Sequence, residues 1–167
     1  ENCFKISPEQ LDAAITKNTK WLVLNSPGNP TGSAYSRKEL EHIGEVLKKH
    51  PHVLIISDDI YEHLVYDGFD YSTLAQACPL LFSRVLTVNG CSKAYAMTGW
   101  RIGFAGGDPK LIKAMSKLQS QSTTNPCSIS QAAAIEALTG PNTYLQERAS
   151  EFSKRRDLVV DLLNQAK

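Results

Sequence analysis

Short runs of apolar residues recur along the chain, and segments with helical periodicity separate them. The runs at residues 21–24 and 53–56 are wholly apolar, and residues 84–88 form a third run of strand length. Because the first two runs lack the alternation of a half-exposed strand, they are typical of a sheet that is covered on both faces. Residues 101–105 are expected to form a fourth strand.

The intervening segments carry helix signals, namely capping residues and apolar residues spaced three or four positions apart. Ser7 caps a first short helix that runs to about Ile15. Ser36 caps a second helix, which ends at His50–Pro51. Further helices are expected at residues 109–118, 129–138 and 143–166.

This alternation of strands and helices predicts the α/β class, as a three-layer sandwich built around a mostly parallel sheet. In such sheets, ligands gather at the carboxyl ends of the strands. Polar segments stand at these ends, at residues 25–32, 57–63 and 89–101. The pattern therefore predicts a binding site to which three strand ends contribute.

Lys93 has the most distinctive chemistry in these segments. It follows the third strand and the turn residues Asn89 and Gly90, which hold its amine at the mouth of the sheet. Arg101, eight positions further on, offers a planar cation that can clamp a phosphate through two parallel hydrogen bonds. An imine-forming amine beside a phosphate clamp suits an enzyme that uses pyridoxal phosphate.

Residues 92–103 read Ser-Lys-Ala-Tyr-Ala-Met-Thr-Gly-Trp-Arg-Ile-Gly and resemble the cofactor-lysine signature of the class I aminotransferases of fold type I. Residues 25–32 and 57–63 resemble two further motifs of this family, in the same order. The likeness covers essentially the whole chain and is closest to bacterial aspartate aminotransferases, whose members often also accept prephenate. It implies an enzyme that moves an amino group between an amino acid, aspartate or glutamate, and a 2-oxo acid. The implied cofactor is pyridoxal 5'-phosphate.

The resemblance also implies the catalytic residues. Lys93 would form the imine with the cofactor aldehyde and, once freed by substrate, would move a proton between the substrate α-carbon and the cofactor C4′ atom. Asp58 would pair with the pyridine nitrogen and keep it protonated. Asp59 competes for this role, but the family spacing Asp-x-x-Tyr selects Asp58, since Tyr61 lies three positions beyond it. Asp59 is then expected to be a hydrogen-bonding or solvated side chain.

The same resemblance implies the rest of the cofactor and substrate site. Tyr61 and Asn29 would hydrogen-bond the phenolic oxygen of the cofactor, and Asn29 would also help to hold the substrate α-carboxylate. Ser92 would contact the phosphate through its hydroxyl, and Arg101 would contact it as a fork. Residues 122–126 resemble a family loop near the subunit interface.

Other functions use the same residues and stay open at this point. A carbon–sulfur lyase of the same fold would start from the same carbanion, so it would need Lys93, Asp58 and Arg101 equally. An aminotransferase-like sensing domain of a transcription regulator is a further alternative. The balanced charge argues against DNA contact by this chain.

The chain is short for the family that it resembles. Class I aminotransferases are more than twice as long as these 167 residues. We therefore expect a fragment, in which residues 1–140 are part of the large cofactor-binding domain. Residues 141–167 would be the long helix that leads to a small domain, which is missing. The piece alone is expected to be inactive, and the full-length enzyme is expected to be a homodimer.

Composition limits the partners and the compartment. The 18 basic and 17 acidic residues give a net charge of +1, which provides no field to attract nucleic acid or an anionic membrane. The apolar runs are too short to cross a bilayer. The cysteines and histidines show no metal-ligand or redox spacing. We therefore expect reduced thiols, no metal site and a cytoplasmic protein.

Overall fold

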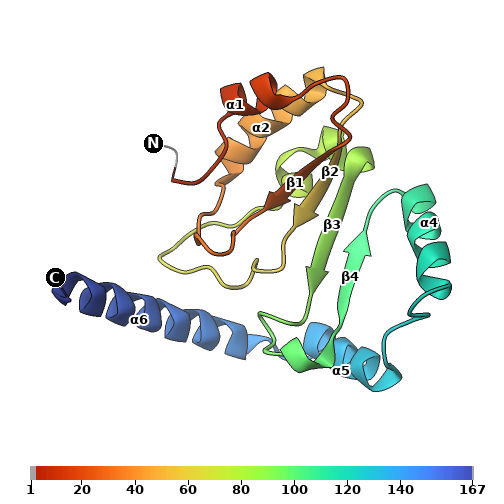
Figure 1. Ribbon diagram of the computed structural model, residues 1–167. Helices are drawn as coiled ribbons and strands as arrows, with labels where there is room; N and C mark the ends of the chain where they lie inside the picture. Colours follow the sequence, from red (N-terminus) through yellow and green to blue (C-terminus); the bar gives the residue numbers. More distant parts are fainter. Residues whose placement is uncertain (1–2, 167) are drawn as a thin grey trace.

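The computed structural model of the chain describes residues 3–166. A sheet forms its centre, with the strands in the order β1 (Trp21–Asn25), β2 (Leu54–Asp58), β3 (Val85–Gly90) and β4 (Gly103–Gly106) (Figure 1). The first three strands pair in parallel, and β4 pairs antiparallel to β3. These pairings confirm the predicted mostly parallel sheet.

Helices occupy the segments between and after the strands. They are α1 (Pro8–Ala14), α2 (Arg37–Lys49), α3 (Leu74–Ala77), α4 (Pro109–Ser120), α5 (Ser128–Thr139) and α6 (Thr143–Gln165), with the 3₁₀ turns η1 (Pro79–Arg84) and η2 (Thr98–Trp100). The sequence pattern predicts α1, α2, α4, α5 and α6 with closely matching ends. It misses α3, although Thr73 and Gln76 form a capping box there that is a local sequence signal.

Capping boxes also begin α1 and α2, as predicted. The Ser7 and Ser36 side chains each accept a hydrogen bond from a backbone N–H in the first turn, and the side chain of that same residue bonds back to the cap. Helix α2 then packs Leu40, Ile43 and Leu47 into the main hydrophobic core. The caps set where the helix begins, and the apolar spacing sets which face it buries.

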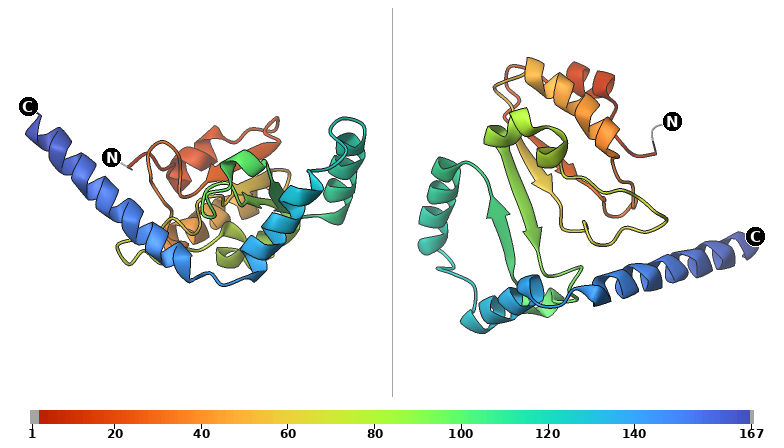
Figure 2. Two further views of the ribbon diagram at one scale, coloured as in Figure 1. Left: turned by 90° about the horizontal axis from the view of Figure 1, so that it is seen from below. Right: turned by 180° about the vertical axis from the view of Figure 1, so that it is seen from behind.

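The main core lies on one face of the sheet, under α1, α2 and α3 (Figure 2). Leu24 of β1 and Ile55 of β2 point into it, with 6% and 0% of their surface exposed. The side chains on the other face of β1 are more open, because Val23 is 62% exposed and Trp21 is 38% exposed. Within residues 3–166, β1 is therefore covered on one face only, although its wholly apolar sequence suits a strand covered on both.

Helix α6 runs past the carboxyl ends of β1, β2 and β3 and then extends away from the sheet (Figures 1 and 2). Helix α4 lies beside β4, at the opposite edge of the sheet from β1. Among the described residues, no helix combines the length and the apolar character needed to span a membrane.

Arg101 lies outside the fourth strand, so the predicted strand at residues 101–105 is wrong at its start. Arg101 follows the turn η2 with a left-handed backbone, at a φ of 51°. Pairing with β3 needs extended backbone, and it begins at Gly103. The side chain of Arg101 is therefore placed by a turn and not by the alternation of a strand.

Candidate functional site

The three polar segments begin at the same edge of the sheet. Asn25 at the end of β1 lies in register with Asp58 at the end of β2, and Asp58 lies in register with Val88 of β3. Lys93 is the third residue after β3, which ends at Gly90. Parallel pairing thus gathers the strand ends as predicted, at the edge where α/β sheets bind ligands.

Asn29 lies in the loop after β1, and hydrogen bonds at the base of the loop hold its backbone. The Asn25 side chain accepts from the Asn29 backbone N–H at 3.2 Å and donates to the Asp58 carbonyl at 3.2 Å. The peptide bonds that precede Pro27 and Pro30 are cis. The Asn29 side chain is exposed, so its amide is open to a ligand.

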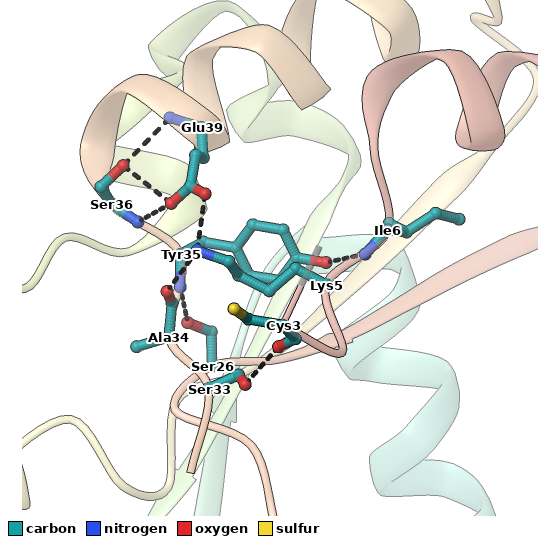
Figure 3. Close-up of polar contacts among 9 residues, drawn as sticks. All are labelled: Cys3, Lys5, Ile6, Ser26, Ser33, Ala34, Tyr35, Ser36 and Glu39. Atoms are coloured by element: carbon teal, nitrogen blue, oxygen red, sulfur yellow. Dashed lines mark hydrogen bonds and ion pairs between the residues drawn. The ribbon is translucent and has the colours of Figure 1, made fainter. Parts of the chain in front are cut away.

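The far end of this loop is anchored to the core through Tyr35, which is 8% exposed (Figure 3). Its backbone N–H donates to Ser26 Oγ at 3.0 Å, and its hydroxyl accepts from the Ile6 N–H at 2.8 Å. Burial raises the pKa of Tyr35, so the hydroxyl stays protonated at neutral pH. Lys5 adds an ion pair with Glu39 of α2 at 2.6 Å. The loop therefore starts and ends on fixed backbone.

Asp58 and Asp59 point to opposite faces of the sheet, as neighbours in a strand do. Asp58 is half-buried, and its Oδ1 accepts from the Ile60 backbone N–H at 3.2 Å. Asp59 is 2% exposed, and Ser57 Oγ donates to its Oδ1 at 2.9 Å. Asp59 is thus a hydrogen-bonding side chain, as one of the two expectations had it, and it is not solvated.

Lys93 and Tyr61 come together although they lie on different segments. The Lys93 Nζ atom stands 5.7 Å from the centroid of the Tyr61 ring, within range of a cation–π contact. The Lys93 side chain is exposed, whereas the flanking residues Cys91 and Ala94 are 0% and 2% exposed. The buried neighbours fix the backbone, and the amine stays accessible for covalent chemistry.

Ser92 and Arg101 stand near this amine in sequence, but among the described residues no side-chain hydrogen bond or ion pair links either of them to Asn29, Asp58, Tyr61 or Lys93. Ser92 is half-buried. Arg101 is exposed, and its Nη1 donates to the Thr98 carbonyl at 2.8 Å. Within residues 3–166, no hydrogen bond or ion pair links Arg101 to Asp58 or Lys93. Their contact with a phosphate remains a prediction.

A cavity of about 540 Å³ lies between the loops after β1 and β2 and helix α6. Asn29 and Tyr61 line it, together with apolar side chains of both loops and Phe152 of α6. Asp58, Ser92, Lys93 and Arg101 are not among its lining residues. The cavity therefore adjoins the candidate site and shares two of its predicted residues.

An ion pair between Arg156 and Asp67, both of which line this cavity, was not predicted from the sequence. Arg156 of α6 donates to both carboxylate oxygens of Asp67, at 2.5 and 3.2 Å, and lies 5.0 Å from the centroid of the Tyr66 ring. The pair lowers the pKa of Asp67. The partners are 89 residues apart, so no local motif could have indicated this contact.

The donor set at the sheet edge suits an anionic aromatic aldehyde and does not suit a metal ion. Lys93 supplies an accessible amine, Asp58 a carboxylate at the strand end, and Arg101 an exposed guanidinium with N–H groups beyond the one given to Thr98. In the part of the chain that the structure describes, no cluster of histidine, cysteine or acidic side chains could hold a metal.

Comparison with known proteins identifies a family. The family model described as "Aminotransferase class I and II" matches residues 1–167. The chain is 60% identical over 167 residues to an "Aspartate/prephenate aminotransferase" of Cereibacter sphaeroides, covering 100% of this chain and 42% of the relative. It is 58% identical over 161 residues to an "Aspartate aminotransferase" of Rhizobium meliloti, covering 96% and 39%. The chain thus spans about two fifths of the length of these relatives.

Solved structures agree with this result. The crystal structure of the aspartate aminotransferase from Rhizobium meliloti superposes with a TM-score of 0.95 at 58% identity, over 97% of this chain and 40% of that one. The aspartate aminotransferase from Thermus thermophilus with maleate gives a TM-score of 0.87 at 43% identity, over 96% and 41%. The resemblance to class I aminotransferases and the predicted α/β fold class are thereby confirmed.

Proposed function

Because the chain belongs to the aminotransferase class I and II family, we propose that the protein transfers an amino group between an amino acid and a 2-oxo acid. The observation that carries this proposal is the 60% identity to an aspartate/prephenate aminotransferase over all 167 residues. Aspartate and glutamate are the proposed amino donors. A carbon–sulfur lyase and a sensing domain are not favoured, because the relatives named above are aminotransferases.

Pyridoxal 5'-phosphate is the cofactor that this family uses, and we propose that the strand-end residues hold it. When bound, this cofactor withdraws electrons from the bonds of the substrate α-carbon. Lys93 would attach it covalently, which the accessible amine between two buried neighbours supports. Freed by substrate, the same amine would take the proton from the α-carbon and return it at the C4′ atom.

Asp58 would bond to the pyridine nitrogen and keep a proton there. Its position on the last residue of β2, reachable from the sheet edge, supports this role over Asp59, which is 2% exposed on the other face. Tyr61, 5.7 Å from Lys93 Nζ, and Asn29, in the same cavity wall, would donate to the phenolic oxygen. Donors there stabilise the oxygen as an anion.

Arg101, Ser92 and Asn29 are the residues proposed to bind the cofactor phosphate and the substrate carboxylate. Arg101 would bind the phosphate as a fork, and Ser92 would donate its hydroxyl. Asn29 would also hold the substrate α-carboxylate. Arg101 and Asn29 are both exposed, which supports these roles because their polar groups are accessible to a ligand.

The proposal extends to the domain organisation, the oligomeric state and the cellular location of the protein. Residues 1–140 would be part of the large cofactor-binding domain, and residues 141–167 would lead to a small domain. The working enzyme would be a homodimer, which the exposed apolar side chains of α5 and α6 support, since such surfaces are normally covered. A cytoplasmic location is part of the same proposal.

Covalent capture of the cofactor tests the proposal most directly. The purified protein is mixed with pyridoxal 5'-phosphate and reduced with borohydride, and the modified peptide is located by mass spectrometry. We expect modification at Lys93, none in Lys93→Ala, and an unchanged result in the control Lys110→Ala, which removes an exposed lysine on α4. Modification elsewhere, or equal labelling of both variants, would refute the assignment.

A paired assay on the full-length enzyme separates transamination from elimination. Amino transfer from aspartate or glutamate to a 2-oxo acid is measured beside the release of pyruvate and ammonia from cysteine conjugates. We expect transfer that depends on the oxo acid, and its loss in Asp58→Ala. Release of pyruvate without amino transfer would replace the proposed function by the lyase.

A further inference from the structure

Asp59 is a buried acid that the proposed reaction does not use. It is 2% exposed, and one of its oxygens accepts from Ser57 Oγ at 2.9 Å. The other oxygen, Oδ2, is buried and has no hydrogen-bond partner within residues 3–166. A buried carboxylate is tolerated only where hydrogen bonds satisfy it, so this oxygen calls for a partner.

Tyr71 also has a polar atom without a partner among residues 3–166, and this atom can donate a hydrogen bond. Its hydroxyl is also buried and has no hydrogen-bond partner in the described part of the chain. Burial raises the pKa of Tyr71, and the negative charge of the Asp59 carboxylate raises it further. A tyrosine hydroxyl that stays protonated is a donor, and a carboxylate oxygen is an acceptor.

We propose that Asp59 and Tyr71 are each other's hydrogen-bond partner, and that this pair positions Asp58 and Tyr61 for the reaction. The pair closes the loop that leaves β2 at Asp59 and returns at Tyr71, just before α3. Tyr61 lies on this loop, near its start. The inference deepens the proposed function and rests on it where the reaction is concerned.

Hydrogen bonds connect Asp59 to the segments that hold the candidate site residues. Its N–H donates to the Val88 carbonyl of β3 at 2.9 Å, and its carbonyl accepts from the Glu62 N–H at 2.9 Å. The Glu62 carboxylate in turn accepts from Asn89 Nδ2 at 2.6 Å. This network joins the end of β2, where Asp58 stands, to Asn89 of β3, four residues before Lys93. A shift of Asp59 would therefore move the carboxylate and the amine relative to each other.

Burial and nearby carboxylates both disfavour the ionised form of Asp59, so each of its oxygens needs a hydrogen-bond donor. Burial is the main cause of the raised pKa of Asp59, and the neighbouring carboxylates of Glu62 and Asp58 raise it further. The hydrogen bond from Ser57 opposes these effects, and the proposed hydrogen bond from Tyr71 would do the same. The pair can keep one shared hydrogen bond whether the proton sits on the acid or on the phenol. An asparagine at position 59 should therefore preserve the function, since its amide can serve both neighbours.

The test compares Tyr71→Phe, Asp59→Ala and Asp59→Asn in the full-length enzyme loaded with pyridoxal 5'-phosphate. We expect kcat to fall about 10- to 100-fold in the first two variants, because small misplacement of reacting groups has effects of that order. The pH midpoint of the visible absorbance of the bound cofactor should rise, since Tyr61 no longer stabilises the phenolic anion as well. Asp59→Asn should stay close to the wild type in both measurements.

The control is Ile43→Val, which trims a residue of α2 that is 1% exposed and lowers stability without touching the loop. If Tyr71→Phe and Asp59→Ala lose stability as this control does but keep kcat and the absorbance midpoint, the pair is purely structural and the proposal is overturned. An Asp59→Asn variant as impaired as Asp59→Ala would also overturn it. The double variant Asp59→Ala/Tyr71→Phe should be no worse than Asp59→Ala alone.

A measurement without cofactor keeps this inference separate from the proposed function. Hydrogen exchange of the Asp59 and Glu62 amides should quicken in Tyr71→Phe, because both amides bond within the network that the pair fixes. A wild-type protein that binds no pyridoxal phosphate would refute the proposed function. Unchanged exchange in Tyr71→Phe would refute the pair, whatever the cofactor does.

Discussion

The first half of the chain is held by burial, whereas the last third depends on a few specific contacts. Ile43, Leu47 and Ile55 are at most 1% exposed in the core under α1 to α3. In contrast, α4 buries no side chain and α6 buries only Leu145 among the described residues. The candidate acid Asp58 stands on a strand of the packed half, so its position follows from core packing. The wall of the adjoining cavity that α6 provides has no such support.

The apolar stripe of α6 shows the contrast most clearly. Leu158, Leu162 and Leu163 recur with the spacing of a buried helix face. They are 59%, 56% and 68% exposed. The periodicity thus predicts the helix correctly, but the stripe contributes little to stability within residues 3–166.

Truncation of a core residue in each half should give the largest difference. Ile55→Ala should lower the free energy of unfolding by about 3 kcal/mol, because it leaves a cavity at a residue of β2 that is 0% exposed. Leu162→Ala should change it by less than about 0.5 kcal/mol, as exposed substitutions usually do. Urea denaturation followed by circular dichroism measures both. Equal losses in the two variants would mean that α6 is packed in solution, and the contrast would fail.

Helix caps should give a smaller difference in the same direction. Ser36 caps α2 with a complete capping box, whereas Asn142 makes no side-chain hydrogen bond at the start of α6. Ser36→Ala should therefore lower the free energy of unfolding by about 1 kcal/mol. Asn142→Ala should leave it unchanged within about 0.3 kcal/mol, since no cap bond is removed. Denaturant midpoints of the two variants decide the matter, and a larger effect at Asn142 would contradict the comparison.

Local signals account for the parts of the fold that the sequence predicted well. The boxes at Ser7 and Ser36 depend on residues three positions apart, and the strands of the sheet announce themselves as short apolar runs. Such patterns are visible without knowledge of the tertiary fold. Arg101 was misplaced for the same reason, since a left-handed residue after a 3₁₀ turn leaves no apolar pattern.

The candidate site was predictable as motifs but not as geometry. The spacing of Asp58 and Tyr61 selects Asp58 by resemblance, and this choice stays a prediction, although the structure buries the competing Asp59. The partners of the buried and cavity-lining groups could not be foreseen. The proposed contact of Tyr71 with Asp59 spans a loop, and Arg156 reaches Asp67 across 89 residues of chain. The contacts of Ser92 and Arg101 with a phosphate remain predictions.

The contact between Arg156 and Asp67 is the place where the weakly packed helix meets the packed half, and its loss should have the smallest but most local effect. Arg156→Ala removes both hydrogen bonds to Asp67 and the contact with the Tyr66 ring. Hydrogen exchange of the Leu64 and Phe69 amides, which bond within this loop, should quicken at neutral pH. Global stability should hardly change, because exposed ion pairs contribute little.

Arg155→Ala is the matched control for this contact. It removes the same charge from the neighbouring position of α6, where Arg155 bonds to Glu151 of its own helix at 3.2 Å. Exchange in the loop after β2 should therefore stay at the wild-type rate. Equal effects of the two variants would show that charge, and not the contact with Asp67, holds the loop.

Acid should reproduce the effect of Arg156→Ala in the unmodified protein. Arg156 lowers the pKa of Asp67, so the contribution of the pair is complete above the ordinary carboxyl pKa of about 3.9 and is lost as the pH falls through the lowered value. The difference in loop exchange between wild type and Arg156→Ala, corrected for intrinsic rates, should thus persist from neutral pH to mild acid and vanish only in strong acid. A difference that disappears near pH 6, far above the lowered pKa of Asp67, would remove Asp67 from the explanation.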